Sequence, residues 1–210
     1  MIYNNIEINW LGHDGFKLKN SKTIYIDPFK IDKDERADLI LITHEHFDHL
    51  SLEDLNKIVT DQTIIIAAEI CKKELSKLKV KEIKYVKPGD KLKIDDINIE
   101  AVYSYNPSKQ FHPKKDLRVG YILIINNTRI YHAGDTDLVP EMSNLKDIDI
   151  ALLPVSGTYV MDVNEAVEAV KIIKPKIAVP MHYASIIATR KEAEEFKKLA
   201  GKYCKVEILR

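Results

Sequence analysis

Residues 43–50 read THEHFDHL and follow directly on the apolar run DLILI. This short stretch holds three of the seven histidines in the chain, His44, His46 and His49, together with Asp48. A polar loop can carry one histidine for no particular reason, but three at this spacing beside a carboxylate need a common explanation. Loops at the ends of buried strands are where sites are usually built. The stretch therefore predicts a site at the end of a strand.

The side chains of this stretch are those that bind first-row divalent metals. Imidazole and carboxylate suit zinc, manganese or iron. Because side chains alternate along an extended segment, His44 and His46 point the same way and could hold one metal. Asp48 and His49, which follow the turn, could face a second metal. The alternative is a solvated polar helix start, and motif matches do carry false positives, but the three clustered histidines favour metal.

Three further candidates follow apolar strands elsewhere in the chain. Asp135 lies in HAGDTD, where a carboxylate could bridge two cations, and His182 lies in VPMHY. Asp27, in YIDPF, could orient the histidine loop without binding metal itself. Each alone has an ordinary alternative, an Asx-turn residue, a core histidine and a turn former respectively. Their shared position at strand ends is what favours a common site.

Length and composition limit the class of protein. A chain of 210 residues with 45% hydrophobic and 30% charged residues fits one globular domain over residues 1–210. The 32 basic and 32 acidic residues cancel, so the net charge predicts no binding to nucleic acid or to an anionic membrane. The sequence shows neither a leader pattern nor a spanning apolar run, and we expect a cytoplasmic protein. Cys71 and Cys204 are expected to be free thiols.

The local patterns indicate strands with helices between them. Short β-type runs dominate the first 130 residues, and a hairpin is expected where Asn126, Asn127 and Thr128 join YILII to RIYHA. Many of the strands look antiparallel. Helix starts are predicted at three capping pairs, Ser51 with Asp54, Asp162 with Glu165, and Thr189 with Glu192. This pattern predicts an α/β layered protein in which helices cover sheet faces.

Taken together, the motifs resemble the metallo-β-lactamase superfamily over nearly the whole chain. The resemblance rests on Asp27 in IDPF, on H-x-H-x-D-H at residues 44–49, on Asp135 in AGDTD and on His182 in PMHY, in that order. The WLGHDGF stretch and the short chain resemble small prokaryotic metal-dependent hydrolases, similar to ascorbate-phosphate lactonase-like proteins. The resemblance implies a four-layer αβ/βα sandwich with a dinuclear site at the edge shared by its sheets.

The resemblance also implies a role for each motif residue. His44 and His46 would bind the first metal, Asp48, His49 and His182 would bind the second, and Asp135 would bridge both. The family usually adds a third histidine to the first metal, but Asn106 stands where that histidine aligns. His112 follows six residues later, and we expect it to reach the site as the missing ligand or as a substrate contact, with Asn106 or water as the alternative. His13 is a further candidate for a supporting or substrate contact, or for a turn.

The expected pair of metal ions indicates hydrolysis by a metal-bound water molecule. A pair of divalent cations, zinc first and manganese or iron as alternatives, lowers the pKa of bound water to about 7 and polarises the scissile group. Asp48 is the candidate catalytic residue, placed to hold the resulting hydroxide or to move a proton. The segment from Lys109 to Arg118 carries four cations against Asp116 alone, which favours an anionic small molecule unless it is an ordinary solvated loop.

We therefore predict a metal-dependent hydrolase of a small, anionic ester, lactone or phosphodiester. The alternatives are a nucleotide- or RNA-directed phosphodiesterase resembling ribonuclease Z, against which the neutral net charge counts, and a non-catalytic metal-binding module. A redox role at a di-iron site is weaker, since no further redox domain is apparent. The substrate and the oligomeric state, including a homo-oligomer, are left open by the sequence.

Overall fold

The computed structural model describes residues 1–32 and 35–210 of the chain. Its strands form two seven-stranded sheets. The first sheet contains β1 (Ile2–Tyr3), β2 (Ile6–Gly12), β3 (Gly15–Lys19), β4 (Thr23–Ile26), β5 (Leu39–Ile42), β6 (Ile64–Ala68) and β7 (Glu82–Val86). The second contains β8 (Lys91–Ile94), β9 (Ile97–Tyr103), β10 (Val119–Ile125), β11 (Thr128–His132), β12 (Ile150–Pro154), β13 (Ile177–Met181) and β14 (Lys205–Val206).

The two sheets share one mixed topology. In each sheet the first four strands along the chain pair antiparallel, and the remaining pairings are parallel. The expectation of mainly antiparallel strands is therefore wrong for β4–β7 and β11–β14. Strands such as β5 and β12 are buried at every residue, as parallel strands covered on both faces are. The strands β3 and β8, whose apolar residues alternate with lysines, were not predicted.

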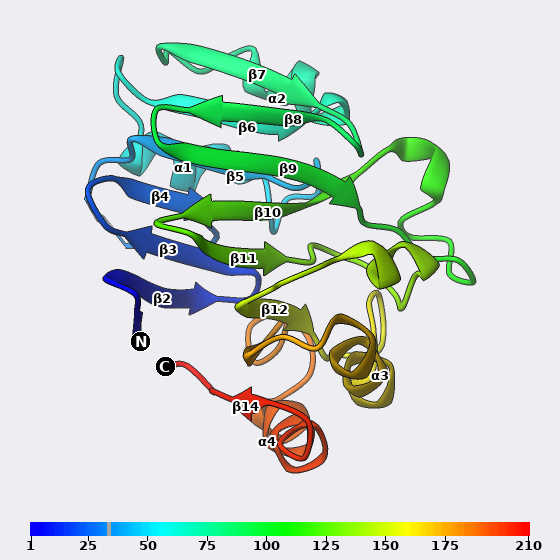
Figure 1. Cartoon of the computed structure of the whole chain (residues 1–210). Coiled ribbons are helices and arrows are strands. Elements are labelled where there is room, and N and C mark those ends of the chain that lie inside the picture. The colour runs from blue at the N-terminus through cyan, green and yellow to red at the C-terminus, as the bar shows by residue number, and fades with distance from the viewer. Residues whose placement is uncertain (33–34) are drawn as a thin grey trace.

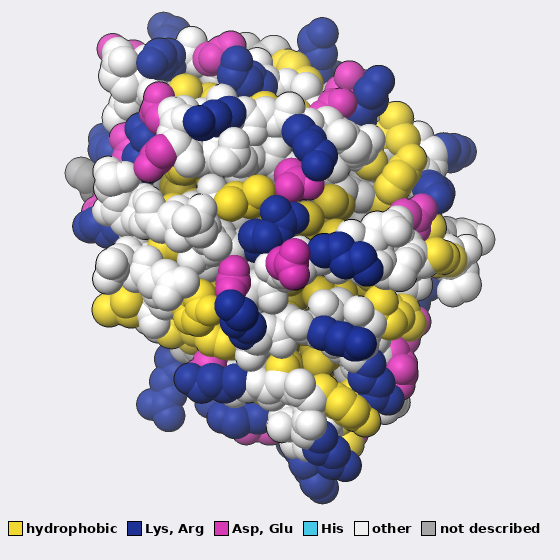
Figure 2. Space-filling view, in the orientation of Figure 1, with side chains coloured by type: hydrophobic (Ala, Val, Ile, Leu, Met, Phe, Trp, Pro, Cys, Tyr) yellow, Lys and Arg dark blue, Asp and Glu magenta, His cyan; other side chains and the backbone are white. Residues whose placement is uncertain are grey.

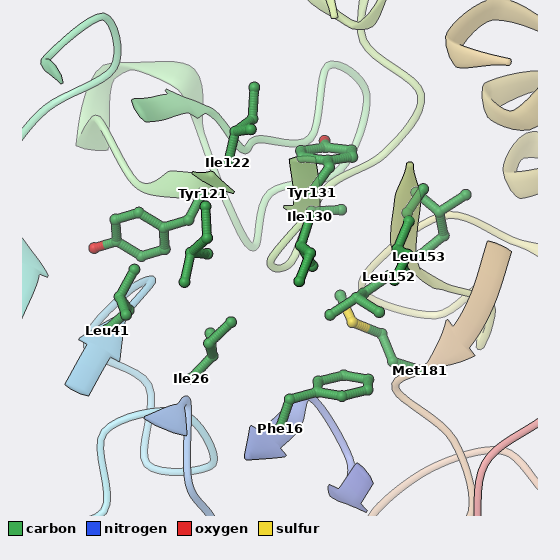
Figure 3. Close-up of a cluster of buried hydrophobic side chains, with 14 of the residues drawn as sticks. Phe16, Ile26, Leu41, Tyr121, Ile122, Ile130, Tyr131, Leu152, Leu153 and Met181 are labelled. Carbon is green, nitrogen blue, oxygen red and sulfur yellow. The ribbon is translucent and has the colours of Figure 1, made fainter. Parts of the chain in front are cut away.

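The core lies between the two sheets. In Figure 3 the side chains of Tyr121, Ile130 and Leu152 on the second sheet point toward those of Ile26 and Leu41 on the first. The alternate residues of the second sheet point to its other face, as the twofold period of a strand requires. The Tyr121 hydroxyl crosses the gap and donates to the Ile42 carbonyl at 2.8 Å. The buried apolar residues of both sheets form one cluster, and the one-domain interpretation stays a prediction.

Among the described residues, four α-helices lie outside the sheets. They are α1 (Leu52–Ile58), α2 (Lys72–Leu75), α3 (Val163–Ile173) and α4 (Arg190–Ala200). The first two lie behind the first sheet in Figure 1, whereas α3 and α4 pack beside β12 and β14 of the second. The two sheets with helices outside them are the predicted αβ/βα sandwich. Short 3-10 turns lie at η1 (Glu69–Cys71), η2 (Lys114–Asp116) and η3 (Pro140–Asn144).

The predicted local signals mostly act as expected. Ser51 caps α1 through the Asp54 N–H, and reciprocal capping boxes start α3 and α4. The hairpin turn consists of Asn126 and Asn127 alone, both with positive φ, because Thr128 already pairs with Ile125 in the ladder. Both cysteines are free thiols. Among the described helices, none is long and apolar enough to span a membrane.

Candidate metal centre

The loops that follow several strands meet at one edge of the sandwich. In Figure 1 the arrowheads of β2, β11 and β12 all point to the right-hand side of the molecule. β13 runs parallel to β12. β5 runs parallel to β4, which has the same direction as β2 because both pair antiparallel with β3. The turn after β2, the histidine loop after β5, and the loops after β11 and β13 therefore gather at this edge. The sequence motifs are brought together because their strands end there.

Two groups of potential ligand atoms lie at this edge. The first, which we call the imidazole group, contains His44, His46 and His112, with ligand atoms within 4.8 Å of one another. The Nε2 atoms of His44 and His112 lie 3.1 and 3.2 Å from His46 Nδ1. The second, which we call the mixed group, combines two clusters that share His49 and His182, and the ligand atoms within each cluster also lie within 4.8 Å of one another. Its members are His13, Asp14, Asp48, His49, Asp135 and His182.

Asp135 lies between the two groups. Its Oδ2 atom is 3.4 Å from His112 Nε2, 3.9 Å from His44 Nε2 and 3.4 Å from His182 Nε2. Its Oδ1 atom is 3.3 Å from His49 Nε2. Gly134 lets this residue turn into the site, since Gly134 has φ +63° and a Cβ there would meet Ser104 Oγ at 3.0 Å. The carboxylate can thus touch ions held by either group.

The structure separates the roles of His112 and Asn106. His112 is buried beside His44 and His46, and its Nδ1 donates to Asn106 Oδ1 at 2.9 Å. The backbone holds the same pair, because the Asn106 N–H donates to the His112 carbonyl at 2.7 Å. Asn106 Oδ1 is therefore used to orient the imidazole, which leaves His112 Nε2 facing the group. The geometry favours His112 over Asn106 as a ligand.

Arg118 ties the loop that carries His112 to the loop that carries His46. Its Nε donates to Glu45 Oε2 at 3.0 Å, its Nη2 donates to Glu45 Oε1, and its Nη1 donates to the Phe111 carbonyl at 2.9 Å. A bidentate guanidinium–carboxylate pair has a fixed geometry. Because Glu45 precedes His46 and Phe111 precedes His112, Arg118 sets the distance between those two imidazoles.

The remaining histidines are oriented from behind by hydrogen bonds. Asp27 accepts from His49 Nδ1 and from the Thr43 N–H, both at 2.8 Å, and also from the Thr43 hydroxyl. The Thr43 oxygen then accepts from His44 Nδ1 at 3.0 Å. His182 Nδ1 lies 2.8 Å from Ser156 Oγ. In each case one ring nitrogen is engaged and the other faces the centre, which is the arrangement that fixes a metal-binding tautomer.

Several buried polar atoms at the centre have no hydrogen-bond partner among the described residues. They are the Nε2 atoms of His49 and His182, Asp135 Oδ1, and both carboxyl oxygens of Asp14. A buried polar group without a partner costs about 1–3 kcal/mol, and a buried charge costs more. Such a set of converging nitrogen and oxygen atoms fits divalent cations, which would satisfy them together. The residues present therefore suit the metals that the motifs predict.

The pKa shifts of His44 and His112 agree with this fit. Burial lowers the pKa of His44 well below its usual value, and it lowers that of His112 to about 4. A neutral imidazole is the form that binds metal. Burial alone would raise the pKa of Asp135, but His49 and His182 hold it well below the usual range. Burial alone would lower the pKa of His49, but the nearby carboxylates of Asp135 and Asp27 raise it well above its usual value. Negative charge is therefore concentrated around that ring.

Three residues of the centre have a left-handed backbone. The φ angles are +50° at His13, +42° at Asp27 and +59° at His182. A non-glycine residue in this region costs of order 1 kcal/mol or more, and such strain clusters at functional sites. In each case the turn redirects the chain at a strand end, so that the side chain faces the shared edge.

Reasoning from sequence missed several residues of the centre. Asp14 directly follows His13 in WLGHDGF, and the acid beside a candidate histidine was the available signal. Ser156 and Arg118 gave no local signal, because their partners are distant in the chain. His132, the only histidine not assigned a role, supports the centre from the core: its Nε2 donates to the Asp14 carbonyl at 2.8 Å and its Nδ1 accepts from the Gly134 N–H at 3.2 Å.

The basic segment 109–118 carries little unpaired charge. Lys109 pairs with Asp137, Lys114 pairs with Glu141 at 2.6 Å, and Arg118 pairs with Glu45. An ion pair within the protein leaves little field for a ligand. The segment therefore gives the anionic-substrate prediction less support than its composition suggested.

A separate hollow lies on the outer face of the second sheet. It has a volume of about 610 Å³ and is lined by residues of β9, β10, β11 and η3, including Tyr103 and Tyr131. Figure 2 shows this face, on which apolar side chains are interspersed with lysine, arginine and acidic side chains. Of the charges that line the hollow, Lys91 and Arg129 both pair with Glu100, at 3.0 and 3.2 Å. It contains none of the candidate ligands.

Comparison with known proteins agrees with the fold and the motifs. The family model of the beta-lactamase superfamily domain matches residues 7–182. A UPF0173 metal-dependent hydrolase of Thermoplasma acidophilum is 36% identical over 208 residues, which cover 94% of this chain and 92% of that protein. A crystal structure from Parabacteroides distasonis has a TM-score of 0.87 at 37% identity and covers 98% of this chain and 94% of that one. Igni18, a metallo hydrolase from Ignicoccus hospitalis, has a TM-score of 0.81 at 25% identity, with coverages of 98% and 95%. The chain belongs to the beta-lactamase superfamily and, within it, to the group of small prokaryotic metal-dependent hydrolases.

Proposed function

We propose that this protein is a hydrolase of a small ester, lactone or phosphodiester that uses two divalent metal ions. The observation that supports this most is the convergence of two groups of potential ligand atoms on the carboxylate of Asp135. Two adjacent cations lower the pKa of a water molecule and polarise the group to be cleaved. Zinc suits the imidazole group best, whereas manganese or iron also suits the carboxylates of the mixed group.

The side chains at the centre have different proposed roles. His44, His46 and His112 would hold one ion, Asp48, His49 and His182 would hold the other, and Asp135 would touch both. Asp48 Oδ2 also accepts from His13 Nε2 at 3.0 Å. This contact lets the Asp48–His13 pair hold a proton at Asp48 Oδ2 or move it between the two side chains. Asp27, Thr43, Asn106 and Ser156 orient the imidazoles and do not reach the substrate.

Aromatic side chains around the edge support a small organic substrate. Phe47 lies between two proposed ligands and is 68% exposed, and Phe111 directly precedes His112 and is 46% exposed. Phe111 packs edge-on against Tyr159 at 4.6 Å between ring centres, and Phe47 packs against Phe29 at 5.9 Å. Exposed aromatic rings beside a polar centre are suited to the apolar part of a ligand. The anionic character of the substrate and a cytoplasmic location stay part of the proposal without further support.

The test has two steps. Metal content is measured by elemental analysis after the apoprotein is loaded with zinc, manganese or iron, and two ions per chain are expected. The loaded protein is then assayed with chromogenic esters, lactones and phosphodiesters, with Asp135→Ala as the matched inactive variant. Two bound metals with no hydrolysis of any class would favour the non-catalytic metal-binding alternative. Preferential cleavage of RNA or nucleotides would favour the phosphodiesterase alternative.

A further inference from the structure

Asp14 is a buried acid without an assigned role. Its side chain is 0% exposed, and neither carboxyl oxygen has a hydrogen-bond partner among the described residues. Asp27 and Asp48 differ in this respect, since Asp27 accepts from Thr43 and His49, and Asp48 accepts from His13. A buried carboxylate without hydrogen bonds is strongly destabilising unless a cation compensates it.

The backbone holds Asp14 in this position from both sides. Asp14 lies in the turn between β2 and β3, where Gly12 has φ +99° and the β-ladder shifts register. The preceding carbonyl, that of His13, accepts from Trp10 Nε1 at 2.8 Å and from the His182 N–H at 3.0 Å. The Asp14 carbonyl accepts from His132 Nε2 at 2.8 Å. The carboxylate is therefore kept inside by the fold, although no side chain of the described residues hydrogen-bonds it.

The carboxylate is directed at the mixed group. Asp14 Oδ2 lies 3.8 Å from His49 Nε2, and Asp14 forms a set of potential ligands within 4.8 Å with His49, Asp135 and His182. The facing atoms of His49, His182 and Asp135 are unpartnered as well. One divalent cation at this place would satisfy the whole set.

We propose that Asp14 is an additional ligand of the metal ion in the mixed group, an inference that rests on the proposed function. Asp14 then joins Asp48 and Asp135, so that this ion has three carboxylates beside its imidazoles. Hard oxygen ligands favour manganese or iron over zinc, whereas the imidazole group keeps a preference for zinc. The centre would thus bind two different metals, or bind one metal with two clearly different affinities.

The competing explanation is that Asp14 is a neutral acid that shares a proton with Asp135 and only fills the core. The two explanations differ in what Asp14→Asn does. If Asp14 binds metal, the amide removes a charge that the apoprotein cannot compensate, so the apoprotein becomes more stable while the metal binds less tightly. If Asp14 is only structural, the stabilisation that metal confers is unchanged.

The experiment titrates the apoproteins of wild type, Asp14→Asn and Asp14→Ser with manganese and with zinc by calorimetry, and follows their thermal unfolding with and without each metal. We expect manganese affinity at one of two sites to fall by at least about 10-fold in both variants, with the other site unchanged, since even a residue that only supports a ligand contributes that much. Asp149→Asn is the matched control, because Asp149 is a buried acid with its own partners at the start of β12. It should leave both affinities unchanged.

The outcomes separate this inference from the function on which it rests. Two metals bound by both Asp14 variants as tightly as by wild type would overturn the assignment of Asp14 alone. A wild-type protein that binds neither manganese nor zinc would overturn the proposed function, and the role of Asp14 with it. A weaker manganese site in Asp14→Ser alone would still support the assignment, because an asparagine oxygen can replace one carboxylate oxygen as a ligand.

Discussion

The imidazole group and the mixed group share the histidine loop after β5, but different parts of the fold complete them. The mixed group comes from the ends of strands or the turns directly after them: His13 and Asp14 after β2, His49 after β5, and His182 after β13. The imidazole group depends on His112, which lies in the long loop 104–118 between β9 and β10. The former is fixed by the sheets themselves. The latter is fixed by Asn106 and Arg118.

This difference predicts which changes should weaken metal binding in each group. A group on strand ends is as rigid as the sandwich, so only the ligands themselves matter. A group completed by a loop also depends on the contacts that hold that loop, since loop segments have lower local stability. We therefore expect the imidazole group to lose its metal more readily, and the following changes test that contrast from the largest expected effect to the smallest.

Asp135→Ala should have the largest effect because Asp135 touches both groups. Removing its carboxylate takes a ligand from both ions and leaves His49 and His182 without their anion. We expect both metal affinities and the hydrolytic rate to fall by more than about 100-fold, beyond the range for supporting residues. Calorimetric metal titration and the hydrolysis assay measure this, with circular dichroism as the check on folding. Retention of two metals at full rate would show that the groups are independent.

The contrast also explains what the sequence could predict. The candidate ligands His44, Asp135 and His182 were predicted because each follows an apolar run, and a strand fixes where its end lies. His49 was predicted from its place in the histidine cluster of residues 44–49. The order and direction of strands were not predicted, because side-chain periodicity carries no information on pairing partners. The parallel halves of both sheets were accordingly missed.

The position of side chains in loop 104–118 could be predicted only in part. The sequence offered His112 and Asn106 as alternatives, because no periodic pattern places a side chain in a loop of this length. Two contacts of the packed structure favour His112: its hydrogen bond to Asn106, and the pairing of Arg118 with Glu45 across 73 positions of the chain. Asp14 was missed for a different reason: its role depends on the absence of hydrogen-bond partners, which only the packed structure reveals.

His112→Ala and His182→Ala should separate the two groups. Each variant removes one imidazole, so each should weaken one ion by about 100-fold and leave the other within a few-fold of wild type. The two variants should lose different ions. Titrations with zinc and with manganese distinguish the two ions if each metal prefers a different site. Metal titration of each variant against wild type is the measurement. If both variants lose the same ion, the division into two groups is wrong.

Asn106→Ala and Ser156→Ala remove the corresponding support from each group. Asn106 orients His112 and Ser156 orients His182, at 2.9 and 2.8 Å. We expect Asn106→Ala to weaken the imidazole-group ion by about 10-fold or more, because this bond sets the ring orientation of a histidine that lies in a long loop. Ser156→Ala should have less effect, since the backbone N–H of His182 is also bound to the His13 carbonyl. Equal losses in the two variants would contradict the proposed contrast between loop and strand.

Arg118→Met should have the smallest effect on metal binding, because Arg118 acts on the ligands through the Phe111 carbonyl, through Glu45 and through one long contact of 3.4 Å from its Nη2 to His46 Nε2. We expect the affinity of the imidazole group to fall by less than about 10-fold, at the low end for supporting residues, with the mixed group unchanged. Glu45→Gln and the double variant complete a double-mutant cycle in which the losses should not add, since both changes break one contact. Additive losses would mean that Glu45 and Arg118 act on the site separately.

The pH dependence of stability provides an independent readout of the same pair. Burial alone would raise the pKa of Glu45, but the hydrogen bonds from Arg118 lower it below its usual value. A carboxylate whose pKa is lower in the folded state stabilises the protein above its unfolded-state pKa, and this contribution is lost as the pH falls through the folded-state pKa. The difference in unfolding free energy between wild type and Arg118→Met should therefore be largest near neutral pH and shrink below about pH 4. Because Glu45 is partly exposed, solvent screening keeps this difference small, of order 1 kcal/mol. A difference that stays constant with pH would show that the Glu45 pair does not contribute to how Arg118 holds the loop. The other contacts of Arg118, to the Phe111 carbonyl, Asp116 and His46, would then hold it.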